Sequence, residues 1–149
     1  MIRITSEELV SFAREYCNIT RYGKGMQCCA LTKSVIADKA AQTHLKSWYA
    51  SRDAKNKKIP KDMNNKQYLD SQVGIAKYGA DCCGLIKGIG YGNRVNGPTT
   101  KYINADDDTI QTMANDCLNK KTDVRECEPG EFISTKDFSH CAIVSVKGK

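Results

Sequence analysis

Apolar residues recur at helical spacing over two stretches in the first third of the chain. Residues 6–17 begin with Ser6-Glu7-Glu8-Leu9, which resembles a capping box, and continue with an apolar face made by Leu9, Val10, Phe12 and Ala13. We expect a helix that opens at Ser6 and runs to about Tyr16 or Cys17. A second helix, from about Met26 to Ala50, is predicted by the spacing of Leu31, Val35, Ile36, Ala40, Ala41 and Leu45. Residues 18–25 and 51–66 are polar with glycine or proline, and both are predicted to be loops.

The pattern changes toward the end of the chain. A helix is expected over residues 109–118, and the acidic run 104–108 before it is interpreted as its N-terminal cap, because the glycine and closing glutamate of a calcium loop are missing. Residues 126–133 predict a turn into a strand, and residues 138–146 predict a second strand. Helices first and strands last predict an α+β fold, with N-terminal helices packed on a small antiparallel sheet.

A short helix with a cysteine in its first turn is predicted in the middle of the chain. Asp81 can cap it, Cys82 follows at once, and the helix is expected to end at Ile89 or Gly90. Gly84 and Gly88 lie four residues apart and leave one side bare, which predicts close packing against a neighbouring element. The positive end of a helix lowers the pKa of a thiol, and its free N–H groups can stabilise an oxyanion.

Of the two histidines, His140 is the better candidate for a general base. It lies at the start of the predicted final strand, whereas His44 lies on the polar side of a predicted helix and is interpreted as a surface residue. A cysteine on a helix followed by a histidine on a strand is the layout of a thiol enzyme. Tyr22, in the first loop, fits a core aromatic and a pocket wall equally well.

Composition limits the other classes of function. The 149 residues predict one domain, and 40% hydrophobic with 27% charged residues is typical of globular proteins. No apolar run approaches the roughly 20 residues of a membrane span, and the N-terminus lacks a signal-peptide pattern. We therefore expect synthesis in the cytoplasm and no membrane partner. The net charge of +6 fits either a solvated surface or a polyanionic partner, but no nucleic-acid-binding motif is present, so nucleic acid is not the expected partner.

The eight cysteines are expected to be reduced thiols. Two adjacent pairs, Cys28-Cys29 and Cys82-Cys83, agree with this, because neighbouring cysteines pair with each other only under strain. Cys28 and Cys29 are interpreted as small buried apolar groups. No C-x₂₋₄-C knuckle occurs, so the sequence predicts no metal site and no other cofactor.

Four stretches resemble the NlpC-type peptidoglycan cysteine peptidases, a family with a papain-like fold. The nucleophile motif of that family is matched by Asp81-Cys82-Cys83-Gly84-Leu85-Ile86, and its Pro-Gly-acidic strand opening by Pro129-Gly130-Glu131-Phe132. The histidine strand is matched by His140-Cys141-Ala142-Ile143-Val144, with alanine in place of glycine, and Tyr22-Gly23 is similar to the pocket element. The Lys87-Gly88 continuation looks most like members from phages and prophages.

The resemblance implies a site and an activity. Cys82 is then the nucleophile and His140 the base of an endopeptidase or amidase that cleaves the peptidoglycan stem peptide. Tyr22 and Asp81 line the substrate site, where Asp81 either holds a free amine or caps the helix, and Cys83 is a neighbour without a chemical role. The implied place of action is the bacterial cell wall, reached after release from the cytoplasm.

One departure from the family keeps several alternatives open. Members carry a third polar residue on the strand after the histidine strand, but this chain ends at Lys149, and Ser145 and Lys147 are poor substitutes. Either the chain 1–149 is a C-terminally truncated domain, or the orienting residue comes from elsewhere, or activity is reduced or absent. Missing strands would leave a sheet edge free to pair with another chain. The competing functions are a non-catalytic wall-binding or structural relative and a cysteine enzyme with another substrate.

Overall fold

Six helices and two small sheets make up the described part of the computed structural model, which covers residues 4–89, 109–115, 117 and 119–147. The elements are α1 (Ser6–Cys17), β1 (Thr20–Tyr22), β2 (Cys29–Ala30), α2 (Lys33–Ala41), α3 (Thr43–Ala50), α4 (Asn65–Gln72), β3 (Tyr78–Ala80), α5 (Cys82–Gly88), α6 (Ile110–Asn115), the 3₁₀ turn η1 (Val124–Glu126), β4 (Phe132–Ser134) and β5 (Cys141–Ile143). The mixed α+β class is confirmed. The expected cap at residues 104–108 lies outside the described residues, whereas the cysteine helix ends at Gly88 with Ile89 as its C-cap, slightly earlier than expected.

The arrangement of the sheets differs from the prediction. A three-stranded sheet in the order β1-β3-β2 lies among the helices, with β1 parallel and β2 antiparallel to β3. Only the terminal pair β4-β5 forms the expected antiparallel hairpin. The prediction missed the first sheet because its strands are two or three residues long, too short for an alternating pattern to be recognised.

The first helix was predicted well. It spans Ser6–Cys17 as expected, but its cap is Thr5, one residue earlier than the pattern suggested. The Thr5 side chain accepts a hydrogen bond from the Glu8 backbone at 3.2 Å, and the Glu8 carboxylate accepts one from the Thr5 backbone at 2.8 Å. This reciprocal pair is the capping box that fixes where the helix starts.

The prediction of a single helix from Met26 to Ala50 is wrong. Cys28 has a φ of 53°, in the left-handed region, and the chain forms β2 before any helix begins. Thr32 then caps α2, and the extended backbone of Gln42 separates α2 from α3. Because Leu31, Val35 and Leu45 are all buried in the same core, their spacing reflects a shared core and not one continuous helix.

The loop predicted over residues 51–66 ends close to where α4 begins. Asn64 and Gln67 form a second capping box, with hydrogen bonds of 2.8 Å in both directions. This box starts a helix in a stretch whose hydrophobic pattern is ambiguous.

Two apolar clusters hold the elements together. The larger one lies among α2, α3, α4 and the first sheet, and its fully or nearly fully buried members include Met26, Ile36, Leu45, Tyr49 and Leu69. The smaller one lies between α1 and α5 and consists of Phe12, Cys28, Ala80 and Ile89. Cys28 and Cys29 are both buried, as the sequence indicated.

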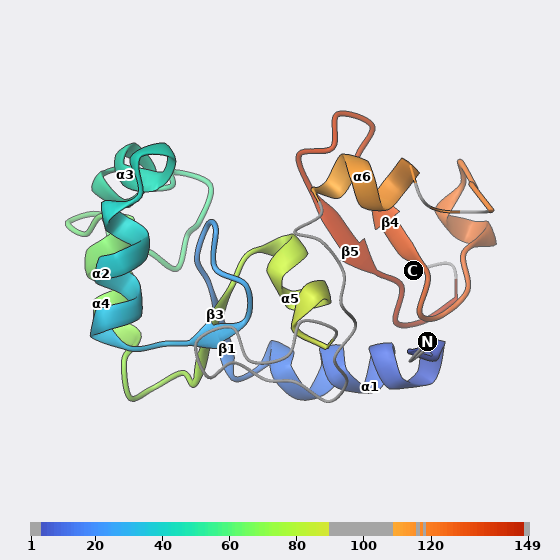
Figure 1. Cartoon of the computed structure of the whole chain (residues 1–149), viewed down its shortest axis with the longest axis horizontal. Coiled ribbons are helices and arrows are strands. Elements are labelled where there is room, and N and C mark those ends of the chain that lie inside the picture. Colours follow the sequence, from blue (N-terminus) through green and yellow to red (C-terminus); the bar gives the residue numbers. More distant parts are fainter. Residues whose placement is uncertain (1–3, 90–108, 116, 118, 148–149) are drawn as a thin grey trace.

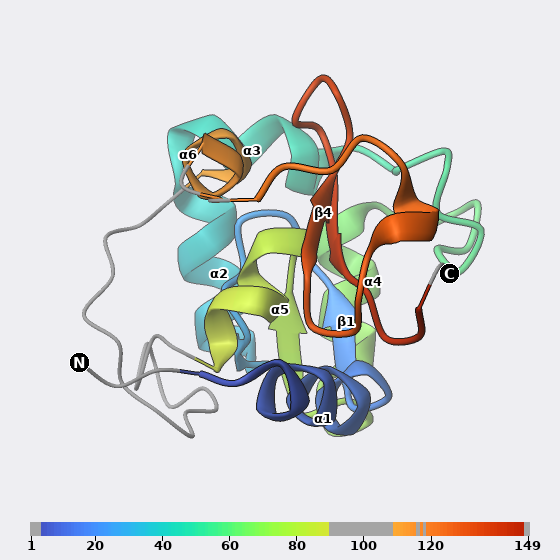
Figure 2. The same ribbon diagram turned by 90° about the vertical axis from the view of Figure 1, so that its right-hand side faces the viewer.

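Helix α5 lies between the two halves of the molecule (Figure 1). The α2, α3 and α4 group lies on one side, and the β4-β5 hairpin lies on the other (Figure 1). In the turned view the hairpin stands above α1 and in front of α5 (Figure 2), and β5 packs directly on α5. The hairpin therefore delivers residues near 140 to the start of α5.

The two glycines of α5 allow its close packing, as predicted. A Cβ on Gly84 would lie 2.0 Å from the carbonyl oxygen of Met26, and one on Gly88 would lie 2.7 Å from the Cβ of Cys28. The bare side of α5 therefore presses on the segment that precedes β2.

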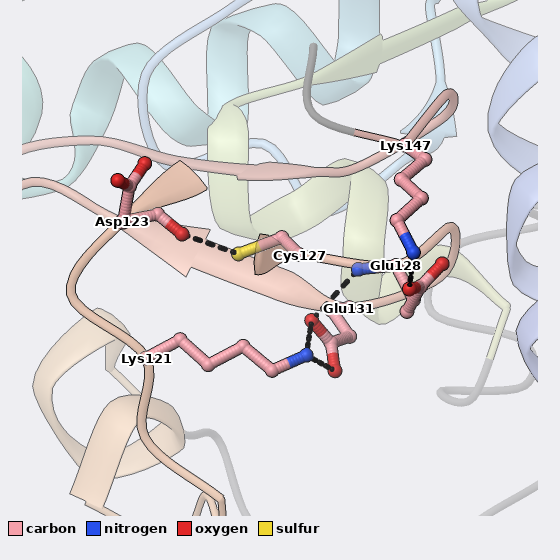
Figure 3. Close-up of polar contacts among 6 residues, drawn as sticks. All are labelled: Lys121, Asp123, Cys127, Glu128, Glu131 and Lys147. Atoms are coloured by element: carbon pink, nitrogen blue, oxygen red, sulfur yellow. Dashed lines mark hydrogen bonds and ion pairs between the residues drawn. The ribbon is translucent and has the colours of Figure 1, made fainter. Parts of the chain in front are cut away.

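Charged groups fasten the start of the hairpin (Figure 3). Lys121 contacts both carboxylate oxygens of Glu131, at 2.7 and 2.8 Å, and a Glu131 oxygen also accepts the Glu128 backbone N–H at 3.0 Å. Lys147 pairs with Glu128, so the segment after β5 is tied to the segment before β4. No helix among the described residues is long and apolar enough to cross a membrane.

Candidate active site

Cys82 is the first residue of α5, directly after the cap. Asp81 provides that cap: one carboxylate oxygen accepts the Gly84 N–H at 2.7 Å, and the other accepts the Gly25 N–H at 2.9 Å. Its own N–H donates to the Met26 carbonyl at 2.8 Å. Burial raises the pKa of Asp81, although these two backbone hydrogen bonds act to lower it. Capping is therefore an observed role of Asp81, and it holds Cys82 in place.

His140 is distant from Cys82 in the sequence but lies close to it in the fold. It is an exposed residue immediately before β5, and the Thr135 side chain accepts its backbone N–H at 3.0 Å. Thr135 in turn donates its backbone N–H to the His140 carbonyl at 2.9 Å. These bonds close the hairpin, and the packing of β5 on α5 brings the imidazole near enough to Cys82 to help lower the pKa of its thiol. The structure thus joins the two residues that the sequence singled out.

The pKa of Cys82 is held far below its ordinary value of 9.0. The largest cause is a hydrogen bond from Cys141, followed by one from Cys83, and the His140 side chain adds a smaller contribution. Hydrogen bonds to the charged form of a group favour that form. These hydrogen bonds therefore favour the thiolate form of Cys82, the form in which a thiol is a nucleophile.

Cys141 was missed as a site residue by the sequence analysis. Its Sγ lies 3.5 Å from the Sγ of Cys83, and the Sγ atoms of Cys82, Cys83 and Cys141 all lie within 4.8 Å of one another. The hydrogen bond to Cys141 lowers the pKa of Cys83, but the bond to Cys82, burial and the charge of Cys82 raise it to about 11. The pKa of Cys141 is raised, first by its bond to Cys82. The available signal was the position of Cys141 directly after His140.

Tyr22 is a pocket wall, which decides the alternative that the sequence left open. The residue is 39% exposed, and its ring packs edge-on against Trp48, with centroids 6.3 Å apart. Tyr22 pairs with Ala80 in the parallel register of β1 and β3, so it stands beside the residues that follow Ala80. Burial, then the charges of Cys82 and Asp81, raise the pKa of Tyr22 to about 12.

A cavity of about 620 Å³ opens at Cys82. Its walls come from α1, β1, α5 and β5, and its polar lining includes Arg14, Arg21, Tyr22, Asp81, Cys82 and Ser145. The two arginines were not found by sequence reasoning, because isolated basic residues on a helix and a short strand carry no motif. The volume falls within the usual range for small-molecule and peptide pockets.

Neither substitute for a third catalytic residue orients His140. The carbonyl of Ser145 accepts a hydrogen bond from Arg14 at 3.0 Å, and Lys147 pairs with Glu128. Within the described residues, the hydrogen bonds of His140 run through its backbone to Thr135. His44 is exposed on α3, as expected, away from the residues that line the cavity.

No family model, curated protein or solved structure matches this chain. The function is therefore inferred from the residues of the site.

Proposed function

We propose that the protein is a cysteine hydrolase that cleaves an amide bond in the stem peptide of peptidoglycan, and that its 149 residues form a papain-like domain of the NlpC type. The observation that carries the proposal is that Cys82, at the start of α5, lies close to His140, just before β5, which helps to lower the pKa of the Cys82 thiol. The nucleophile and the base come from two packed elements, and Cys82 lines a cavity of about 620 Å³.

The chemistry follows from the order of the two groups. The Cys82 thiolate attacks the amide carbonyl and forms a tetrahedral adduct. His140, as imidazolium, gives its proton to the leaving amine as the C–N bond breaks, which leaves an acyl-enzyme. The imidazole then takes a proton from water, the hydroxide attacks the thioester, and the Cys82 thiolate is released.

Three features support the choice of substrate. Asp81 lines the cavity beside the nucleophile, so the carboxylate that caps α5 can also face a free amine of a stem peptide, and Tyr22 supplies a wall against which a peptide can pack. The net charge of +6 suits an anionic cell wall. The motifs around Cys82 and His140 resemble those of phage and prophage wall enzymes, so we infer action at the wall after release from the cytoplasm, without a cofactor.

The test is digestion of purified peptidoglycan by the full chain, by Cys82→Ala and by Cys117→Ala, with mass spectrometry of the released fragments. Cys117 is a half-buried thiol outside the three-thiol site, so Cys117→Ala matches the change in chemistry without touching the site. We expect fragments from the parent and from Cys117→Ala, and none from Cys82→Ala. Equal release by all three proteins, or release by none, would contradict the proposal.

A second candidate is favoured by the hydrogen bonds of His140, which in the described part of the chain run through its backbone to Thr135. An imidazole without an orienting group is a weaker base, and the protein would then be a wall-binding or structural module with the fold of a hydrolase. This function predicts that the chain sediments with peptidoglycan but releases no fragments. Release of fragments that depends on Cys82 eliminates it.

A further inference from the structure

Three cysteine thiols meet where α5 packs on β5. Cys82 and Cys83 come from the first turn of α5, and Cys141 is the first residue of β5. Their sulfur atoms lie within 4.8 Å of one another, with 3.5 Å between Cys83 and Cys141. In the proposed hydrolysis only Cys82 forms a covalent bond, and the other two thiols serve only to lower its pKa. A cluster of three thiols can also bind a metal ion.

The spacing of the three sulfurs suits a thiophilic metal ion. Zinc binds thiolate at about 2.3 Å in tetrahedral geometry, which places neighbouring sulfurs about 3.8 Å apart. The Cys83–Cys141 distance is 3.5 Å and neither of the other two exceeds 4.8 Å, so small rotations of the side chains would bring all three sulfurs onto one ion. Both elements that carry them are regular and packed together, which reduces the cost of ordering the ligands.

His140 is the candidate for the fourth position because it directly precedes Cys141, and three cysteines with one histidine form a common structural zinc set. Its ring nitrogens lie outside the 4.8 Å group formed by the three sulfurs, so the imidazole has to turn toward the ion to complete the set. The C-x₂₋₄-C rule missed this set because two ligands are adjacent in sequence and the third lies on a distant strand.

A disulfide explains the cluster less well. A disulfide joins two sulfurs at about 2.05 Å, whereas three sulfurs are gathered here and all of the cysteines are free thiols. A pair would also leave the third thiol without a role.

We propose that Cys82, Cys83 and Cys141 bind a thiophilic d¹⁰ cation, zinc in the first instance, with His140 as the fourth ligand. Binding displaces the thiol protons and places the lone pairs of Cys82 on the metal, so the ion blocks this sulfur as a nucleophile. The metal-bound chain is then an inactive form that a chelator activates. Metal binding does not depend on which substrate the protein cleaves, or on whether it cleaves one.

The test is a titration of the reduced, metal-free full chain with Cd²⁺ under anaerobic conditions, followed by the ultraviolet sulfur-to-metal charge-transfer absorption. Zn²⁺ affinity is then measured by competition with a chromophoric chelator. We expect one ion per chain, and a loss of affinity of at least about 100-fold in Cys83→Ser and in Cys141→Ser, more than the loss of an outer-sphere partner causes. His140→Ala is expected to weaken binding while keeping the charge-transfer absorption.

Cys117→Ser is the matched control, because it removes a half-buried thiol outside the cluster, and it should bind as the parent does. Circular dichroism of each variant separates loss of a ligand from loss of folding. Equal affinities in the parent and the two cluster variants would overturn the proposal. So would a Cys83–Cys141 disulfide, found by mass spectrometry in the protein purified without reductant, together with no metal binding after reduction.

The two proposals can fail separately. The charge-transfer absorption that reports metal binding is measured without substrate. The peptidoglycan digestion is run on metal-free protein with chelator present. Binding without digestion would leave a metal module, and digestion without binding would leave a hydrolase in which Cys83 and Cys141 serve only to lower the pKa of Cys82.

Discussion

At the scale of single residues, the site depends on how Cys82 is surrounded. Its main stabilising partners are Cys141 and Cys83, and the histidine is a smaller contributor to its low pKa. A conventional cysteine–histidine pair relies mainly on the imidazole. Here the thiolate is stabilised largely by other thiols, which has a consequence that can be measured.

Cys82 is expected to stay reactive in mild acid. An ordinary thiol has a pKa of about 8.5 and loses roughly tenfold in thiolate for each pH unit below it. Because the pKa of Cys82 is far below its ordinary value, its alkylation by iodoacetamide should change little between pH 8 and pH 6. Peptide mass spectrometry of the metal-free chain measures the rate at Cys82, with a short cysteine peptide as the reference thiol.

Alkylation by iodoacetamide also separates the causes of the low pKa of Cys82. Cys141→Ala removes the largest stabilising hydrogen bond, so the pKa of Cys82 should rise and its alkylation at pH 6 should slow relative to pH 8. Cys141→Ser keeps a hydroxyl donor and should lie between the parent and the alanine variant. If Cys82 in the parent slows tenfold per pH unit as the peptide does, the thiolate assignment is wrong.

At the scale of elements, α5 is positioned by contact with backbone atoms. Gly84 faces the Met26 carbonyl, and that carbonyl also accepts the N–H of Asp81. A side chain at Gly84 would therefore meet the atoms that hold the cap of the helix. A backbone contact of this kind cannot be relieved by turning a flexible side chain.

Gly84→Ala is expected to destabilise the fold by about 3 kcal/mol or more, at the upper end of the cost of overpacking. The new Cβ would lie 2.0 Å from the Met26 oxygen and 2.7 Å from the Cα of Gln27. Urea unfolding measures the loss, and slower alkylation of Cys82 at pH 6 would show that α5 has moved.

Gly74→Ala is the matched comparison. Gly74 has a φ of +85° and no atom within 4 Å of a new Cβ, so its replacement costs only the left-handed conformation, about 1–2 kcal/mol. Alkylation of Cys82 in the Gly74→Ala variant should depend on pH as it does in the parent. If Gly84→Ala cost no more than Gly74→Ala, α5 would not be held by this contact.

The sequence predicted those elements whose signals are local. The face and acidic first turn of α1, the glycine pair of α5 and the polar turn of the β4-β5 hairpin all lie within a few residues of the element that they define. Cys82 and His140 could be found because each begins such an element. The β1-β3 pairing and the break at Gln42 depend on contacts between distant segments. For the same reason the sequence did not reveal Cys141 beside Cys83, or Arg14 and Arg21 in the cavity wall.

At the scale of the whole molecule, the two halves of the site differ in how firmly they are held. The helical part contains the larger core cluster, with Met26, Ile36 and Leu69 fully buried. Each residue of β4 and β5 is only half-buried or is exposed. The ion pairs Lys121–Glu131 and Lys147–Glu128 that fasten the hairpin are solvent-accessible, and such pairs contribute about 0–1 kcal/mol each.

We therefore expect the β4-β5 hairpin to open before the rest of the chain unfolds. Elements with few buried apolar contacts exchange their amide protons through local opening, whereas core helices exchange near the global unfolding free energy. Hydrogen exchange followed by mass spectrometry should show peptides over residues 131–144 exchanging much faster than peptides over α2 and α4. Because His140 lies on this hairpin, each opening would separate the base from Cys82.

Two substitutions distinguish local from global opening. Val144 is 1% exposed just after β5, and Leu69 is fully buried in the larger cluster. Val144→Ala should speed exchange in the hairpin with little change in the urea midpoint, because its loss is confined to the element that already opens. Leu69→Ala should lower the urea midpoint, with a loss of about 2–5 kcal/mol, and should speed exchange throughout. If Val144→Ala speeds exchange in α2 and α4 as much as in the hairpin, the chain unfolds as one unit, and the base is then held as firmly as the nucleophile.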